Sequence, residues 1–484
     1  MAPDKPETPR FIRALGLSDV FLMTIAATIS PQLAARGARA GAPSVLLWLV
    51  AALVFLVPHT LVVAELGGRY AEQGGIYAWV RRAFGPVHGF VCAWCLWLNN
   101  LFFFPAVLLF AAPNLLLALG PDLAGLADSH AYSSIFVLAS LWLAIGVNVI
   151  GLKAARWLPN IGSAGVWGSG ALLTGLGALA WMARGSATSF AAARLLPSGD
   201  ALGTLGLWSA MCFGFSGYEV AANAREEIFE PERTIPRGVF LAGAVAVLVY
   251  VAGSTAILVA IPAESLSERS GVADAIETMA HRLGLPGLGA VTGACLTLVG
   301  FALTSSWVAG SSRVLFAAAE DQVLPKSLAR LHPRYRTPHV ALVTQGLASS
   351  ALFLASLFFT FGSGRTSVSE AYDILFNLTI LIYFIPYLYL FLALPRLRSH
   401  APAGLARGFR IPGGAAGVGL TAASGFLATA VSLALLFVPP PGTRNVWNYE
   451  ANLVLQTAGL LGVGFVLFAR ARRAHRGPVL APGT

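Results

Sequence analysis

The sequence predicts an all-α protein that crosses a membrane many times, and three observations lead to this fold class. Of the 484 residues, 56% are apolar and only 11% are charged, whereas charged residues make up about a quarter of soluble domains. The mean hydropathy is +0.72. Apolar stretches of about 20 residues, the length that crosses a bilayer as a helix, recur along the whole chain.

Twelve stretches meet this length criterion, and we expect each to form one transmembrane helix. In chain order they cover residues 17–40, 43–66, 86–118, 132–151, 158–183, 202–224, 237–261, 285–318, 339–361, 371–395, 415–438 and 449–469. The first residues carry basic side chains and prolines but no apolar core followed by a cleavage site, so we expect no signal peptide.

The connections between the spans predict the orientation of the chain. Lys and Arg are concentrated in the segments on the same side as the N-terminus, which by the positive-inside rule places both termini in the cytoplasm. The predicted organisation is a tail (1–16), a ten-helix core (17–396), a cytoplasmic loop (397–414), helices 11 and 12 (415–469) and a basic tail (470–484). The net charge of +10 reflects this bias and attraction to anionic lipid, so we expect no nucleic-acid partner.

The sixth stretch contains a weak point. Residues 213–218 read FGFSGY, and each glycine costs roughly 1 kcal/mol in a helix interior. A break in the bilayer is tolerated only where the freed backbone groups line a cavity or bind a ligand, and such breaks are typical of substrate sites in secondary transporters. The alternative is that Gly214 and Gly217 only let a neighbouring helix pack closely. The charged loop that follows places the end of this helix at the membrane surface.

The first stretch is interrupted in a similar way. Pro31, within Ile29-Ser30-Pro31-Gln32, removes a backbone donor in mid-span, which predicts either a simple kink or a break. The interruptions in helices 1 and 6 are five spans apart, as expected if helices 1–5 and 6–10 are inverted repeats. This hypothesis rests on the matched interruptions, because the two halves share no visible residue similarity.

Several motifs resemble the amino acid–polyamine–organocation superfamily in order and spacing. They are residues 64–80 and 84–86 after helix 2, 215–219 and 231–237 around helix 6, 305–313 and 324–325 around helix 8, and 409–414 and 438–440 near helix 11. The last two resemble the glutamate:GABA antiporter branch most. Two departures stand out: helix 1 lacks the family's Gly-x-Gly-Ile-Gly type of break, and helix 5 (158–183) has no lysine of the kind some proton-coupled relatives use.

The resemblance implies a multi-pass permease of the bacterial inner membrane, a monomer or homodimer, with the LeuT-like inverted-repeat fold. It would move amino acids or related amines by alternating access, as an exchanger, with a counter-substrate or a coupling proton. A proton-coupled symporter and a non-transporting solute sensor of the same fold are the alternatives. The implied substrate-binding residues are Ile29, Ser30, Pro31, Gln32, Asn99, Phe213, Gly214, Phe215, Ser216, Gly217, Tyr218 and Trp307.

The resemblance also implies how a substrate would be held. Backbone N–H groups after the breaks, near Ser30 and Phe215, would bind the carboxylate, with the Ser216 hydroxyl as a further donor. Carbonyl groups before the breaks would face the ammonium group. The aromatic residues around the sixth break, together with Trp307, would either close over the substrate or only pack.

Polar side chains at membrane depth are candidates for gating or coupling. Arg313 is predicted to pair with Glu219 or Glu226 as an inner gate. Arg36 and Arg39 share a helix face beyond the first break, where they would either reach the outer interface or attract an acidic substrate.

Three further polar side chains in the apolar stretches, those of His59, Asn99 and Asn100, are consistent with either a structural or a functional role. His59 predicts an interhelical hydrogen bond or a proton relay, and one of Asn99 and Asn100 is expected to face the site.

The remaining motifs favour neither an enzyme nor a metal protein. Cys92 and Cys95 have the spacing of a metal or redox pair, but no second pair or nearby histidine completes a site, so we expect them to pack in the core. No catalytic constellation and no Walker motif is present in the sequence. We therefore expect no cofactor, no metal and no ATP-driven transport by this chain.

Overall fold

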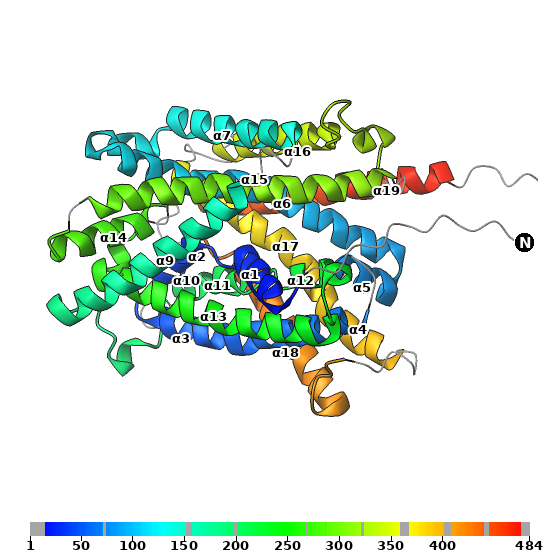
Figure 1. Ribbon diagram of the computed structural model, residues 1–484, viewed down its shortest axis with the longest axis horizontal. Helices are drawn as coiled ribbons and strands as arrows, with labels where there is room; N and C mark the ends of the chain where they lie inside the picture. The colour runs from blue at the N-terminus through cyan, green and yellow to red at the C-terminus, as the bar shows by residue number, and fades with distance from the viewer. Residues whose placement is uncertain are drawn as a thin grey trace, which may run out of the picture.

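The computed structural model describes residues 15–70, 74–151, 157–197, 201–267, 269–285, 287–320, 324–358, 367–400, 408–439 and 445–475. These residues form a bundle in which the long helices run roughly along the longest axis of the molecule (Figure 1). Within these ranges, β structure is confined to one parallel bridge between Leu15 and Ile228.

The helices follow the apolar stretches of the sequence closely. In chain order they are α1 (Leu17–Thr28), α2 (Pro31–Ala38), α3 (Pro43–Ala51), α4 (Val57–Arg69), α5 (Gly75–Phe84), α6 (Pro86–Leu119), α7 (His130–Ile150), α9 (Trp157–Arg184), α10 (Ala201–Gly206), α11 (Trp208–Gly214), α12 (Val220–Asn223), α13 (Pro231–Ala260), α14 (Gly271–Arg282), α15 (Leu288–Glu320), α16 (His339–Phe358), α17 (Val368–Ser399), α18 (Gly414–Leu435) and α19 (Val446–His475).

Ten segments of the described chain are long and apolar enough to cross a membrane, and α1 with α2 forms an eleventh if the bent pair is one span. The prediction of an all-helical, multi-pass membrane protein is therefore confirmed. The short amphipathic helices α5 and α14 were not predicted, because both are shorter than the roughly 20 residues that a membrane-spanning helix needs.

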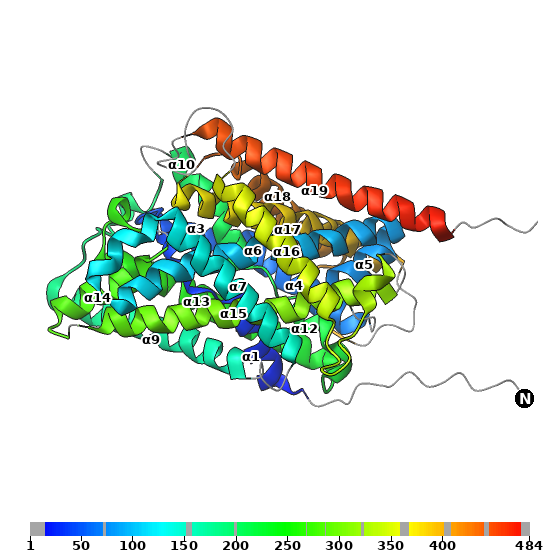
Figure 2. The same cartoon turned by 90° about the horizontal axis from the view of Figure 1, so that it is seen from above.

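Helix α6 forms the centre of the bundle. Its most apolar window is 83% buried, against 22% for α19, which runs along one edge (Figure 2). Glycines allow α15 to approach α6 closely: a Cβ at Gly300 would lie 2.7 Å from the Cβ of Ala111, and one at Gly293 would lie 2.5 Å from the Asn114 carbonyl oxygen. Small residues at a helix contact are the usual means of close packing in membranes, where no hydrophobic effect drives helices together.

The second span changes its winding just before the site. A π-helical segment, Ala52–Leu56, separates α3 from α4, and Pro58 follows in the first turn of α4. Proline cannot donate the backbone hydrogen bond that an α-helix needs at this point, which favours a local change of winding. The next residue, His59, is completely buried and belongs to the site.

Candidate functional site

The first span is broken at Ile29 and Ser30. Both residues are extended, and the axes of α1 and α2 differ by 49°. Pro31 explains the break, because proline lacks an N–H and restricts the preceding residue to extended conformations. The hydroxyl of Tyr250 on α13 bridges the gap: it accepts from the Ser30 N–H at 3.1 Å and donates to the Thr28 carbonyl at 2.7 Å.

The sixth span is broken between Gly214, where α11 ends, and Val220, where α12 begins. Gly217 has φ +94°, in the left-handed region that favours glycine. A Cβ at Gly217 would lie 3.3 Å from Thr28 Cγ2, so the two breaks touch at this point. The Gly217 N–H donates to the hydroxyl of Tyr387 on α17 at 2.8 Å.

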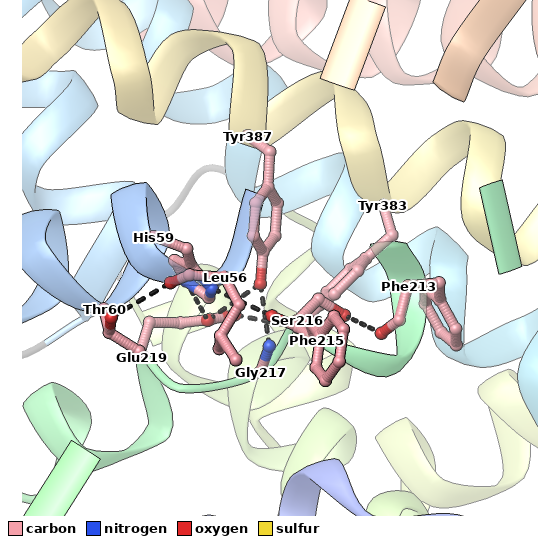
Figure 3. A network of polar contacts seen from close by, with 10 residues as sticks. All are labelled: Leu56, His59, Thr60, Phe213, Phe215, Ser216, Gly217, Glu219, Tyr383 and Tyr387. Atoms are coloured by element: carbon pink, nitrogen blue, oxygen red, sulfur yellow. Dashed lines mark hydrogen bonds and ion pairs between the residues drawn. The ribbon is translucent and has the colours of Figure 1, made fainter. Parts of the chain in front are cut away.

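A buried carboxylate lies at the end of the second break. Glu219 accepts hydrogen bonds from the hydroxyls of Tyr383 at 2.7 Å and Tyr387 at 2.9 Å, and its Oε2 lies 3.4 Å from His59 Nε2. The other ring nitrogen of His59 lies 3.2 Å from the Phe215 carbonyl oxygen. Figure 3 shows the two tyrosines reaching from α17, and His59 from α4, toward the same break.

The contacts of His59 limit where the hydrogen atoms of its ring can lie. A carbonyl oxygen can only accept, so His59 Nδ1 must carry the hydrogen that faces Phe215. The second nitrogen then faces the Glu219 carboxylate, and that contact is favourable only with a proton on His59 Nε2 or on the carboxyl group. The expected hydrogen bond of His59 to another helix is present, and the relay role stays a prediction.

A cavity of about 50 Å³ lies where the two breaks meet α6, α15 and α17. Eight of the residues predicted to bind substrate line it: Ile29, Ser30, Gln32, Asn99, Phe213, Ser216, Gly217 and Trp307. Asn100 and Tyr383 line it as well. Both asparagines line this cavity, whereas one of them was expected from the sequence to face the site.

The other predicted residues lie behind the cavity wall. Gly214 packs beneath Trp48, whose ring atoms would lie 3.1 Å from an added Cβ. Phe215 meets the same tryptophan edge-on, with ring centroids 5.2 Å apart, and Tyr218 meets His59 edge-on. Pro31 starts α2 and is not among the described residues that line the cavity.

The expected carboxylate donors are engaged within the protein. The Ser30 N–H is taken by Tyr250, and the Phe215 N–H donates to the Cys212 carbonyl at 3.0 Å. The Ser216 hydroxyl donates to the Phe213 carbonyl at 2.6 Å. The prediction overlooked the tyrosines, whose hydroxyls saturate backbone groups that a broken helix would otherwise leave open.

Three side-chain atoms of the cavity wall have no partner. They are Nε2 of Gln32 and Oδ1 of Asn99 and of Asn100, all in side chains that are at most 6% exposed. The Asn100 amide nitrogen is satisfied within α6 by the Leu96 carbonyl at 2.8 Å, which leaves its oxygen available. Buried polar atoms without partners are costly, so a ligand entering the cavity would gain by pairing with these three.

The expectation for Arg36 was wrong. Its side chain is buried rather than exposed at an interface or vestibule, and it forms an ion pair with Asp373 of α17 at 3.0 Å. It also donates to Asn377 at 3.0 Å and lies 4.5 Å from the Phe376 ring centroid. Arg39 is partly exposed. An exposed arginine pair that attracts acidic solutes is therefore not formed, because α17 supplies a buried counter-charge that sequence spacing could not reveal.

The predicted ion pair between Arg313 and Glu219 is not formed either. Arg313 is exposed on α15, while Glu219 is buried against His59, Tyr383 and Tyr387. The side chain of Glu226, the other expected partner, lies outside the described part of the structure.

Arg225 holds the loop that follows the broken sixth span against the end of α4. It donates to the Gly67 carbonyl at 2.8 Å and the Gly68 carbonyl at 2.9 Å, and pairs with Glu232 at 3.0 Å.

The tyrosines and Asp373 were missed, although the sequence carries a signal for them. Asp373, Asn377, Tyr383 and Tyr387 interrupt an apolar stretch, and polar groups in a membrane helix require partners. In the described part of the chain, no three His, Cys, Asp or Glu side chains come together as a metal site. Cys92 and Cys95 are buried free thiols.

A multi-pass helical bundle whose two broken spans meet at a small cavity with several polar side chains in its wall has the architecture of a membrane transporter for small solutes. The chain belongs to the amino acid permease family, whose family model matches residues 15–463. The superfamily resemblance seen in the motifs is thereby confirmed. The chain is a transporter of amino acids or amines, and not an enzyme.

Relatives with similar sequences support this assignment. An uncharacterised transporter of Legionella pneumophila is 30% identical over 95% of this chain and 97% of the relative. A probable agmatine/putrescine antiporter of Lactococcus lactis is 26% identical over 82% of each chain. A glutamate/gamma-aminobutyrate antiporter of Lactococcus lactis is 25% identical over 84% of this chain and 80% of the relative.

Proposed function

We propose that this protein is a secondary active transporter that exchanges amino acids or related amines across the membrane by alternating access. The observation that carries the proposal is the cavity at the contact of the two broken spans, with unpaired donors and acceptors in its wall. The substrate-binding residues are those that line this cavity, and Glu219 couples occupancy to the position of α17 through Tyr383 and Tyr387.

The proposed topology has 12 spans. The bent pair α1–α2 is span 1, and the short helices α10, α11 and α12 together form span 6. Spans 1–5 and 6–10 are inverted repeats, since their first members are the two that break. Helices α18 and α19 are spans 11 and 12, outside the ten-helix core.

The proposed setting is the plasma membrane, with both termini in the cytoplasm and the protein a monomer or homodimer. The excess of Lys and Arg in the connections on the side of the N-terminus supports this orientation. The cytoplasmic face would then be the end of the bundle where Arg225 holds the helix-6 loop.

Counterflow tests exchange directly. The purified chain is reconstituted in liposomes that are empty or loaded with unlabelled amino acid, and initial uptake of labelled amino acid is measured at equal pH and potential. Exchange predicts faster uptake into loaded vesicles. Equal rates would contradict exchange, and binding without any flux would indicate a solute sensor.

A second candidate function is proton-coupled symport. The contact between His59 Nε2 and Glu219 Oε2, 3.4 Å long and next to the break, favours it. Residues 158–183, in α9, contain no lysine, so coupling would have to use another ionisable group, and this pair is the one at the break. Symport predicts that an inward proton gradient drives accumulation into empty vesicles, and that a protonophore abolishes it; no effect of the gradient would exclude symport.

A further inference from the structure

The cavity wall carries no formal charge. Of the described residues that line it, those with polar side-chain groups are Thr28, Ser30, Gln32, Asn99, Asn100 and Ser216, together with the aromatic Trp307 and Tyr383. The Glu219 carboxylate contacts the wall through the hydroxyl of Tyr383. Both of its oxygens already accept hydrogen bonds from tyrosines, so it presents no open counter-charge to the cavity.

The unpaired atoms of the wall match the two ends of a zwitterion. Asn99 Oδ1 and Asn100 Oδ1 are acceptors on α6, suited to an ammonium group that has donors but no acceptor. Gln32 Nε2 on α2 is a donor, suited to a carboxylate that has acceptors but no donor. The two kinds of atom stand on different helices, so one bound molecule would bridge them.

The size of the cavity sets a second limit. A water molecule needs about 10–15 Å³ of such volume, so about 50 Å³ holds roughly three to five waters. That is the size range of a small amino acid such as alanine or serine.

We propose that the site binds small neutral zwitterionic amino acids, with the ammonium group at Asn99 and Asn100 and the carboxylate at Gln32, and discriminates against solutes with an additional charge. This inference rests on the proposed transport function. A further buried charge without a counter-charge is strongly unfavourable in a membrane interior, so diamines and acidic amino acids would bind weakly. The relatives named for putrescine or glutamate would then differ from this chain in substrate.

The first test measures binding and uptake separately. Alanine, serine, glutamate, agmatine and putrescine are assayed for thermal stabilisation of the purified protein and for counterflow in liposomes. The inference predicts stabilisation and counterflow with alanine or serine, and at least tenfold weaker apparent affinity for the other three.

Comparable or tighter binding of putrescine, agmatine or glutamate would overturn the inference, with Phe103, Phe213 and Trp307 then serving as aromatic faces for a cation. Transport of only the charged solutes would leave the proposed function intact. Selective stabilisation by alanine without flux would overturn the transport function but not the inference.

Two variants test the pose. Gln32→Leu removes the donor and should raise the apparent KM for the neutral amino acid about tenfold or more. Gln456→Leu is the matched control, since this half-buried amide lies on α19 outside the cavity lining and bonds to Ser356 and Asn452. An unchanged KM in Gln32→Leu would contradict the assigned carboxylate position.

Charge insertion tests the specificity. Asn100→Asp puts a carboxylate in the wall and should strengthen agmatine and putrescine binding about tenfold while weakening alanine selectivity. Asn99→Asp provides the same test if the first variant fails to fold. Folded variants whose relative affinities for alanine and putrescine are unchanged would overturn the claim that the uncharged wall sets the substrate class.

Discussion

The two helix breaks solve the same problem with different chemistry. At the first, Tyr250 alone satisfies the Ser30 N–H and the Thr28 carbonyl, and every participant is neutral. At the second, Tyr387 satisfies the Gly217 N–H, but its own hydrogen goes to the carboxylate of Glu219. One break is therefore closed by a neutral bridge, and the other is linked to an ionisable pair.

This difference indicates at which break the hydrogen bonding can depend on pH. At the first break, the hydrogen-bonded groups are a tyrosine hydroxyl, a backbone N–H and a carbonyl, and none of them gains or loses a proton near neutral pH. Around the second, a proton lost from the His59–Glu219 pair would place a lone pair of His59 against a carboxylate, which is repulsive. We expect the second break to change with pH and the first to keep its geometry.

The largest expected effect comes from blocking the contact between the breaks. Gly217→Val should abolish saturable uptake, because valine is strained at φ +94° and its Cβ would approach Thr28. Gly168→Val is the control, since Gly168 on α9 has no neighbouring side chain near an added Cβ. Uptake kinetics and monodispersity are measured for both. Saturable uptake in Gly217→Val equal to that of the unmodified protein would refute the role of this contact.

Neutralising the ionisable break should have the next largest effect. Glu219→Gln is expected to lower the exchange rate about tenfold and to make it less dependent on pH than in the unmodified protein. The matched control is Glu277→Gln, because Glu277 also pairs with a histidine, His281, at 2.8 Å, but on the short helix α14. The rate is measured across pH in loaded vesicles. A pH profile unchanged in Glu219→Gln would remove the distinction between the breaks.

A pair of tyrosine variants compares the breaks directly. Tyr250→Phe and Tyr387→Phe each remove one bridging hydroxyl and should each destabilise the fold by about 1–3 kcal/mol. Only Tyr387→Phe should also alter the pH profile, because only that hydroxyl contacts Glu219. Thermal unfolding and pH-dependent uptake are compared side by side. Equal shifts of the pH profile in both variants would mean that the first break is no less sensitive to protons.

The smallest effect is expected for Ser216→Ala. Its hydroxyl bonds to the Phe213 carbonyl within the same broken helix, so its loss should change the apparent KM by less than about threefold. A much larger increase in KM, with unchanged thermal stability, would restore this hydroxyl as a ligand for the substrate carboxylate.

The spans could be predicted well from the sequence because the bilayer imposes one length and one polarity on each. Both breaks could also be predicted, since Pro31 and Gly217 carry local signals that need no tertiary information. The partners of the breaks could not be predicted. Tyr250 and Tyr387 lie far along the chain, and only packing brings their hydroxyls to the exposed backbone groups.

Arg36 shows the limit of reading charges by position. Two arginines near a helix end with Gly41 beyond them are typical of an interface. The burial of Arg36 depends on Asp373 and Phe376, which stand on a helix that is distant in sequence. The local sequence pattern therefore predicted that Arg36 lies near a helix end, but not that its side chain is buried beside a counter-charge.

Helix α17 is attached by charge near both of its ends. Asp373 binds Arg36 near one end, and Arg398 binds Glu65 at 3.0 Å near the other. At about 1.5 Å per residue, these attachments are roughly 37 Å apart, more than the hydrocarbon thickness of about 30 Å. The helix is thus tethered by an ion pair near each of its two ends. Tilting it away from one face requires one tether to open while the other serves as the pivot, so a substitution that weakens one ion pair alone would bias the direction of tilt.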